Sequence, residues 1–591
     1  MVYQAPVNDI MFALKSAAGL DELLASGVYE GLDEETIKAV LDEAGRFASE
    51  VLDPLNRTGD QQGAQLSDGI VTTPDGWGEA YEKFTEAGWN GLPCPHDFGG
   101  QGLPQILATA VCEMWNAANM SFGMCPLLTQ GAIDAVTIGG SEELKARYLP
   151  KLVSGEWTGT MNLTEPQAGS DLSMLKARAE PRSDGTYRLF GTKIYISYGE
   201  HELARNIIHL VLARLPDAPA GTRGISLFLV PKLLVNSDGS IGDRNDVVCA
   251  GLEEKLGIHG SPTCVMNYGE KDGAIGYLVG EENKGLATMF IMMNAARLAV
   301  GMQGVAIADR ATQHALIYAH ERRQGRGADG GPDAVAIVEH ADVRRMLLTM
   351  QAMTQAARMI CLVTARETDI ARHMDDANAR TRAQARVALL TPVAKAFATD
   401  VGCEVASLGV QVHGGMGFVE ETGAAQYYRD ARILPIYEGT NGIQAIDLVT
   451  RKIPLEDGEV LQDYLKELEQ IVTDVTRSNR VSFGSMGERL GVALASLSEA
   501  SAWLGEALRS NPQAALAGAT PYLKLFGITA GGCYLARGAL AAEEHGEDRE
   551  RAIDLARFFA ENIAVQAPGL SVSITEGADS LLEVPLKRYS A

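Results

Sequence analysis

The sequence lacks the residue patterns that mark several protein classes. Its eight cysteines stand singly, without a C-x-x-C pair, so we expect no disulfide framework, no zinc site and no other metal. No uninterrupted apolar run reaches the roughly 18 residues of a membrane span. The start of the chain also lacks the basic stretch of a signal peptide. These absences predict a cytoplasmic protein with reduced, buried thiols and no membrane partner.

Basic residues are scarce too. The chain has 51 lysines and arginines against 76 aspartates and glutamates, which gives a formal charge of −25. An acidic surface repels phosphate backbones and anionic lipids, so we expect no nucleic-acid partner. Any anionic cofactor must be held by local donors that act against this overall field.

Four common catalytic motifs are missing as well. There is no Walker-type phosphate loop, no G-x-G-x-x-G after a strand, no H-E-x-x-H and no G-x-S-x-G. A P-loop enzyme, a Rossmann dehydrogenase, a zinc protease and an α/β-hydrolase are therefore not expected. Hydrophobic residues at 46% and charged residues at 21% are those of an ordinary globular protein, here long enough for several domains.

What the sequence does contain is a change of periodicity along the chain. Helical spacing, opened by Asp33 as an N-cap, gives way to short β-branched segments bounded by Gly and Pro, and then returns. We predict an α+β multidomain protein whose middle module is an antiparallel sheet or small barrel, with a loop at residues 325–334. The predicted parts are an N-terminal extension (1–34), an N-terminal helical domain (35–157), a middle β domain (158–280), a second helical domain (281–452) and a C-terminal helical domain (453–591).

Three stretches near the borders of these parts could carry chemistry. MNLTEPQAGSDL (161–172) combines hydroxyl donors with small residues that allow close backbone approach to a heterocycle or pyrophosphate. GTKIYISYGE (191–200) is a strand that would present Tyr195 and Ser197 on one side. Taken alone, the first could be an ordinary turn and the second an ordinary half-buried strand.

The third stretch is residues 411–446. Its His413-Gly-Gly-Met-Gly segment interrupts a helix with backbone that could approach a phosphate or ring, and Arg429-Asp430 suits an internal ion pair. Glu438 follows in an apolar, glycine-flanked setting, where partial desolvation would raise its pKa and make it a usable base. In isolation this tetrapeptide would be better interpreted as a turn with a surface glutamate.

Together the three stretches resemble the acyl-CoA dehydrogenase family. TEPQAGSD resembles its flavin and substrate loop, GTKIYIS its ring-backing strand, and QVHGGMGF, YYRDARI and IYEGTNGIQ follow in the family's order. Residues 296–326 resemble the long helix that begins its second helical domain. The resemblance covers residues 35–452, and the two ends resemble a longer branch that includes enzymes acting on 3-(methylthio)propanoyl-CoA, in dimethylsulfoniopropionate catabolism.

The resemblance implies a reaction and its participants. FAD would lie between the β module and the second helical domain, and Glu438 would remove the α-proton of an acyl-CoA while the β-hydrogen leaves as hydride to flavin N5, giving a trans-2-enoyl-CoA. The Glu438 N–H and the flavin ribityl chain would bind the thioester oxygen. An electron-transfer flavoprotein would accept the electrons, and the protein would be a homo-oligomer, for which we favour a dimer.

The resemblance also assigns residues. The cofactor would be bound by Met161, Leu163, Thr164, Gly169, Ser170, Tyr195, Ser197, Thr440 and Asn441, and from the neighbouring subunit by Arg322, Gln324, Gln411, Gly414 and Gly415. The substrate would be bound by Ser170, Arg297 and Gly439. Some relatives place their base just before the Arg297 position, but here that residue is Ala296.

The sequence departs from the family pattern at two places. Tyr195 stands where the family usually has tryptophan, and the Phe-Gly pair often found after the Arg322 position is absent. Two alternatives remain open: an acyl-CoA oxidase or flavin monooxygenase on the same fold, and a non-metabolic, DNA-associated relative with a basic tail. The tail from residue 453 carries 12 lysines and arginines against 20 aspartates and glutamates, which argues against DNA binding.

Overall fold

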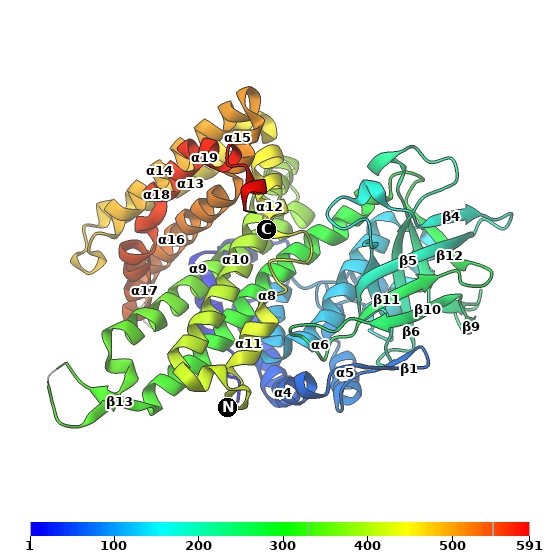
Figure 1. The fold of residues 1–591 in the computed structure, drawn as a ribbon, viewed down its shortest axis with the longest axis horizontal. Helices are drawn as coiled ribbons and strands as arrows, with labels where there is room; N and C mark the ends of the chain where they lie inside the picture. Colours follow the sequence, from blue (N-terminus) through cyan, green and yellow to red (C-terminus); the bar gives the residue numbers. More distant parts are fainter. Residues whose placement is uncertain (1, 329, 546–548, 590–591) are drawn as a thin grey trace.

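The computed structural model describes residues 2–328, 330–545 and 549–589. A twisted sheet lies at one end of the molecule, three long helices run away from it, and a further helical layer covers them (Figure 1). The N-terminal extension forms α1 (Val7–Ser16) and α2 (Leu20–Ala25), and α1 packs between α9 and α16. The first residues of the chain are thereby part of the core rather than an appendage.

The N-terminal helical part supports one side of the sheet. It consists of α3 (Glu34–Phe47), α4 (Asp53–Gln62), α5 (Trp77–Glu86), α6 (Gln105–Gly139) and α7 (Glu142–Val153), with a short hairpin of β1 (Gln65–Ser67) and β2 (Ile70–Thr72). The predicted N-cap is confirmed, because the Asp33 carboxylate accepts a hydrogen bond from the Thr36 N–H at 2.8 Å.

The middle module is a sheet of eight strands in the order β10-β11-β5-β12-β7-β6-β3, with β4 on β5. The strands are β3 (Trp157–Asn162), β4 (Arg178–Pro181), β5 (Tyr187–Ser197), β6 (Asn206–Ala213), β7 (Ser226–Pro231), β10 (Val247–Leu252), β11 (Thr263–Tyr268) and β12 (Ala274–Val279); β8 (Leu233–Val235) and β9 (Ile241–Arg244) form a separate pair. The predicted sheet is present, but its antiparallel pattern fails at one edge, where β3 and β6 run parallel. The chain between them makes β4 and β5, so β6 returns in the direction of β3.

The second helical part is built from three long helices: α8 (Gly285–Glu321), α9 (Ala341–His373) and α10 (Ala377–His413), followed by α11 (Ala424–Ala431) and α12 (Asn441–Asp447). Two glycines let α8 and α10 approach closely. A Cβ added to Gly301 would lie 2.7 Å from the Ala394 carbonyl oxygen, and one added to Gly304 would lie 2.3 Å from that of Ala398. The close approach places the residue after Ala394 against α8.

The segment after α8 contains the predicted loop, but its ends are more ordered than expected. The described residues of 327–333 form the loop, whereas residues 325, 326 and 334 belong to the two strands of a hairpin, β13 (Arg323–Arg326) and β14 (Ala334–Ala336); residue 329 lies outside the described residues. This hairpin lies at the end of the long helices that is remote from the sheet (Figure 1).

The C-terminal part consists of helices joined by short turns and contains no strand among its described residues. It contains α13 (Glu459–Ser478), α14 (Met486–Ser510), α15 (Pro512–Ala517), α16 (Ala519–His545), α17 (Arg549–Asn562), α18 (Ala567–Glu576) and α19 (Ala578–Leu582). Helix α16 packs on α9 and α10, and its buried side chains belong to the same hydrophobic cluster as the N-terminal and second helical parts. The sheet has a separate core.

Three helices are long and apolar enough to span a membrane, by length and composition alone: α8, α9 and, in its Ala519–Ala542 part, α16. The sequence argument looked for an uninterrupted apolar run and found none. It therefore missed these helices, whose apolar stretches include a few charged residues. Within the most apolar stretches of these helices, 67%, 83% and 83% of the residues are buried inside the protein. Packing between helices therefore accounts for most of their apolar character.

The eight cysteines are free, as expected, and six of them are buried.

Candidate functional site

The TEPQAGSD loop and strand β5 are joined by their backbones. The Ile194 N–H donates to the Thr164 carbonyl at 3.0 Å, so the loop lies alongside the strand that carries Tyr195 and Ser197. Gly169 and Ser170 are exposed at the far turn of the loop. The structure thus brings the first two sequence motifs together on the sheet.

A buried ion pair fixes this arrangement. The Lys193 ammonium donates to the Leu163 carbonyl at 3.0 Å and to the Glu165 carboxylate at 2.8 Å, and both side chains are almost fully buried. Glu165 also accepts from the N–H groups of Lys176 and Ala177. Burial lowers the pKa of Lys193 to about 8, an effect that Glu165 partly offsets. Lys193 and Glu165 are functional candidates that the sequence argument missed.

Tyr195 stands at a β-bulge. The register between β5 and β11 shifts beside it, its φ is +61°, and its side chain is 60% exposed. A left-handed tyrosine is costly unless its surroundings hold it. The simple alternation that placed Tyr195 and Ser197 on one side is interrupted here. The bulge turns an aromatic ring outward beside the TEPQAGSD loop.

The turn that carries Glu438 has an unusual backbone. Glu438 and Gly439 both have positive φ, at +55° and +82°, so two successive residues are left-handed and their N–H groups can form a concave donor site. In the described part of the chain, neither N–H donates to a protein acceptor. The next residue, Thr440, caps α12 by accepting from the Ile443 N–H at 3.3 Å.

Side chains from three helices bind the carbonyls of this turn. Arg297 of α8 donates to the Glu438 carbonyl at 3.4 Å, and Lys395 of α10 donates to the Gly439 carbonyl at 3.0 Å. Gln444 of α12 donates to both carbonyls, at 3.2 and 3.3 Å. The carbonyls are therefore satisfied on one side of the turn, while its N–H groups remain available to a ligand.

The Glu438 carboxyl group is suited to proton transfer. Part of the residue remains accessible to solvent, yet burial of its carboxyl group raises its pKa to about 7, against the lowering effect of Arg297 and Lys395. A general base works best when its pKa lies near the working pH, because a useful fraction is then ionised and the ionised form still binds a proton strongly. The expectation of a raised pKa at Glu438 agrees with this setting.

A buried polar network adjoins the turn. The Tyr437 hydroxyl hydrogen-bonds to Gln303 of α8, and Gln303 donates to the Asn116 amide oxygen at 2.9 Å and to the Met124 sulfur at 3.3 Å. Asn116, Met124 and Gln303 are buried. The network therefore holds the side chain of Tyr437, the residue before Glu438, against α6 and α8.

The sheet and the Glu438 turn meet at α8. Met161, at the end of β3, packs against the cluster of Leu127, Leu128 and Ala296. Ala296 directly precedes Arg297, whose guanidinium contacts the Glu438 backbone. Met161, which is expected to bind the flavin ring, and Glu438, the expected base, therefore both lie near the Ala296–Arg297 segment of α8.

The remaining predicted residues lie elsewhere. Arg322, Gln324 and the exposed residues of the segment from Gln411 to Gly415 are at the distal end of α8 and α10, near β13 (Figure 1). Arg322 follows Arg297 by 25 helical residues, or about 37 Å at 1.5 Å per residue. One chain does not bring these residues to its own Glu438 turn.

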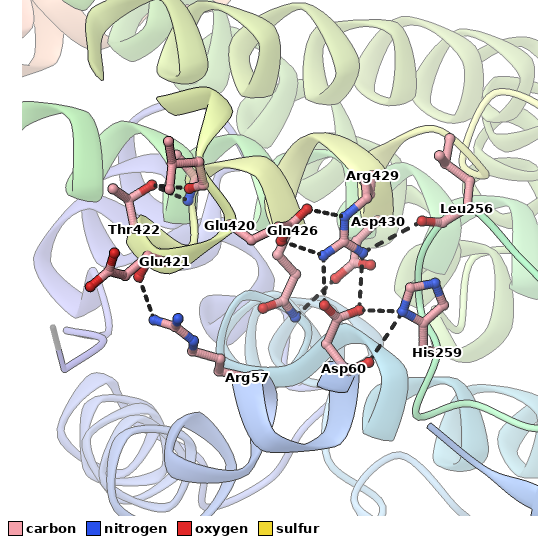
Figure 2. Close-up of polar contacts among 12 residues, drawn as sticks. Arg57, Asp60, Leu256, His259, Glu420, Glu421, Thr422, Gln426, Arg429 and Asp430 are labelled. Atoms are coloured by element: carbon pink, nitrogen blue, oxygen red, sulfur yellow. Dashed lines mark hydrogen bonds and ion pairs between the residues drawn. The ribbon is translucent and has the colours of Figure 1, made fainter. Parts of the chain in front are cut away.

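Two details of the third motif differ from expectation. Figure 2 shows that Arg429 pairs with Asp60 of α4, at 2.6 and 3.1 Å, and with Glu420, rather than with Asp430. Adjacent residues on a helix point apart, and Asp430 instead accepts from the Ile258 N–H at 2.6 Å. This junction ties α11 to α4 and to the β module.

Asn441 is the second detail. Its amide accepts from Lys395 at 2.9 Å and donates to the Ala396 carbonyl, to Thr399 and to Asp400. The side chain is therefore occupied within the protein, and the Asn441 N–H likewise donates to the Pro435 carbonyl at 2.9 Å.

Comparison with known proteins identifies relatives of the whole chain. Family models match in order as follows: "Acyl-CoA dehydrogenase, N-terminal domain" at residues 34–156, "middle domain" at 160–269, "C-terminal domain" at 283–453, and "Acetyl-CoA dehydrogenase C-terminal like" at 464–585. The chain is 48% identical over 593 aligned residues to 3-methylmercaptopropionyl-CoA dehydrogenase of Ruegeria pomeroyi, which covers 99% of this chain and 100% of that protein.

Two solved structures have the same fold. Caenorhabditis elegans ACDH-11, solved in complex with C11-CoA, superposes with a TM-score of 0.81 at 20% identity and covers 100% of this chain and 96% of its own. An acyl-CoA dehydrogenase from Bacillus anthracis, solved with FAD, superposes with a TM-score of 0.74 at 22% identity and covers 93% and 89%. The predicted architecture, including the C-terminal helical part, is confirmed by these likenesses.

Proposed function

Since the chain belongs to the acyl-CoA dehydrogenase family, whose members are FAD-dependent oxidoreductases, we propose that it oxidises a short-chain acyl-CoA, with 3-methylmercaptopropionyl-CoA as substrate and Glu438 as base. The observation that carries the proposal is the Glu438 turn. It combines a carboxyl group whose pKa is raised to about 7 with free backbone donors.

The residues present fit an FAD cofactor. The exposed Tyr195 ring lies beside the TEPQAGSD loop, and Met161 borders α8 close to Arg297. When bound, FAD supplies the acceptor that takes the β-hydrogen of the substrate as hydride. Tyr195, Thr164 and the main chain around Thr440 are the groups of this chain that would hold the ring.

The protein residues perform the proton transfer and stabilise charge. Glu438 takes the proton from Cα of the thioester, which leaves enolate-like charge on the thioester oxygen. The Glu438 N–H, fixed by the left-handed turn, donates to that oxygen, as in an oxyanion hole. Arg297, Lys395 and Gln444 hold the turn from behind through its carbonyls.

The substrate proposal rests on a relative of the whole chain. The relative acts, by its name, on 3-methylmercaptopropionyl-CoA. Such a substrate would place the protein in dimethylsulfoniopropionate catabolism.

Three further proposals concern the setting of the reaction. We propose an electron-transfer flavoprotein as acceptor, a homodimer, and a cytoplasmic location. The dimer is supported by the distance of about 37 Å between Arg297 and Arg322 along α8, because a second copy could bring Arg322 and Gln411 to the FAD of the first. The family does not favour the oxidase, monooxygenase or DNA-binding alternatives.

The substrate test compares acyl-CoAs of different length. With a ferrocenium-type acceptor, kcat/KM should be highest for 3-methylmercaptopropionyl-CoA and for butyryl-CoA. The kcat/KM values of these two substrates should differ by no more than ~10–200-fold, because an apolar pocket discriminates by that much between acyl chains that differ by one group. Octanoyl-CoA should be a poorer substrate than either. A preference for octanoyl-CoA would contradict the short-chain proposal. Rapid reoxidation of the reduced protein by air would support an oxidase instead.

Glu165→Gln tests whether the buried pair holds the flavin loop. The amide keeps the shape of the side chain but loses the charge that Lys193 binds, and a hydrogen bond to a charged group is worth ~1.5–3 kcal/mol. FAD affinity should fall by ~10–100-fold, measured by fluorescence titration of the apoprotein. Glu282→Gln, on an exposed glutamate that accepts from Tyr187, is the control and should leave FAD affinity unchanged. Unchanged affinity in Glu165→Gln would show that the loop is held by other contacts.

A further inference from the structure

The side chain of Lys395 has an unusual position for a charged group. It lies within the apolar stretch TPVAKAFA of α10 and is 0% exposed. Its ammonium donates to two neutral oxygens, the Gly439 carbonyl at 3.0 Å and the Asn441 amide oxygen at 2.9 Å. Among the described residues, no carboxylate forms an ion pair with it. A buried, unpaired lysine is costly and needs an explanation.

We propose that Lys395 is a positioning residue for the base: its ammonium group locks the Glu438–Thr440 turn through the Gly439 carbonyl and Asn441, and so holds a positive charge beside the residue that carries the base. This inference rests on the proposed function, because it assigns Lys395 a role in the same reaction. It concerns a residue that touches neither the substrate nor the reacting atoms.

The first part of the inference follows from the backbone. Two successive left-handed residues are strained unless the surrounding structure holds them, and here Glu438 is not a glycine. Lys395 holds the Gly439 carbonyl on one side of the turn and, through Asn441, the first residue of α12 on the other. The turn is thus fixed at both ends by one ammonium group.

Close packing of α8 and α10 makes the lock rigid. Gly301 allows α8 to approach the carbonyl of Ala394, the residue before Lys395. Arg297, one turn earlier on α8, binds the neighbouring carbonyl of Glu438. The two cations therefore approach the turn from two helices that cannot move apart independently.

The second part follows from charge. Arg297 and Lys395 both favour the ionised form of Glu438, and burial opposes it. Burial lowers the pKa of Lys395 to about 7, and Glu438 raises it, so that the two groups stabilise each other's charged forms. The other titratable or charged groups around the turn are Asp400, Cys403, Tyr437, Asp447 and Arg451.

The test separates the hydrogen bonds from the charge. Lys395→Gln can still donate to the Gly439 carbonyl but carries no charge, whereas Lys395→Met loses both. Flavin reduction by excess substrate is followed by anaerobic stopped-flow bleaching from pH 5.5 to 9 on FAD-saturated protein. Gln444→Met is the matched variant, because it removes hydrogen bonds to the same carbonyls and leaves the charge in place.

The expected results differ for each variant. Both Lys395 variants should shift the pH midpoint of the rate upward by about one unit or more, because a positive charge near the base is lost. Lys395→Met should also lower the limiting rate at high pH by up to ~10-fold, the effect of a lost hydrogen bond to the Gly439 carbonyl. Lys395→Gln should keep the limiting rate within a few-fold. Gln444→Met should lower the limiting rate without a shift of the midpoint.

The outcomes distinguish the inference from the proposed function. A wild-type midpoint retained in both Lys395 variants, with limiting rates within twofold of wild type, would overturn the inference while the function stands. If the wild-type flavin is not bleached by any acyl-CoA, the proposed function fails and the inference fails with it. If Lys395→Met does not retain FAD, the midpoint of Lys395→Gln decides alone.

Discussion

Glu438→Gln should slow the reduction of the flavin by acyl-CoA by at least the ~10²–10⁴-fold that a general base contributes. The substitution keeps the volume of the side chain and the backbone N–H, but the amide cannot accept the α-proton. Folding and FAD binding should survive, because Arg297, Lys395 and Gln444 hold the turn through its carbonyls and not through the carboxylate. Substrate affinity should change little, since the donor to the thioester oxygen is the backbone.

The measurement is anaerobic stopped-flow bleaching with excess substrate, and Glu404→Gln, on an exposed glutamate of α10, is the matched control. The control should reduce at the wild-type rate. Because the pKa of Glu438 is raised to about 7 and the base acts when deprotonated, the wild-type rate should rise with pH through about 7. Bleaching of Glu438→Gln within a few-fold of wild type would mean that another carboxylate is the base.

The parts of this structure that were predictable from sequence are those that depend on local pattern. Helical spacing predicted the long helices, Asp33 was recognisable as a cap, and glycines marked the turns before and after Glu438. The resemblance supplied the roles of the motifs. Residue pattern and motif order together therefore predicted the domain sequence and which segments carry chemistry.

The details that were not predictable depend on partners distant in the sequence. Arg429 could not be paired with Asp60 from the sequence, because 369 positions separate them. The bulge that turns Tyr195 outward arises from the register with β11, and the parallel edge pair from the path of the chain between β3 and β6. These features are set by tertiary contacts that override local alternation.

Lys395 did carry a sign that the sequence argument passed over. A single lysine in the apolar stretch TPVAKAFA must either be buried with partners or reach solvent, and burial marks a functional candidate. What the sequence could not supply is the partner, since the Gly439 carbonyl is 44 residues away. The lysine was detectable, but its role depended on how α8, α10 and α12 meet.

A second large effect is expected in the core that supports this region. Arg358 of α9 donates to the Glu113 carboxylate of α6 at 2.6, 2.9 and 3.0 Å, and to Asp309 of α8 at 3.2 Å. The side chains of Arg358 and Glu113 are 2% and 0% exposed. Burial raises the pKa of Asp309 to about 7, against the lowering effect of Arg358. One guanidinium thus compensates buried carboxylates from two other helices.

Arg358→Met should destabilise the protein by ~3–5 kcal/mol, because it leaves the Glu113 carboxylate buried without a cation. Adding Glu113→Leu should restore part of that loss, since two apolar side chains of similar volume can replace a buried pair, whereas Asp309 still lacks the guanidinium. Arg46→Met, on an exposed arginine that pairs with Glu43 at 2.6 Å, should cost only ~0–1 kcal/mol. The measure is the urea midpoint of tryptophan fluorescence, to which Trp115 in the same core contributes. If Arg358→Met were as mild as the surface control, Glu113 would be compensated without Arg358, and the packing of α6 on α9 would not depend on their ion pair.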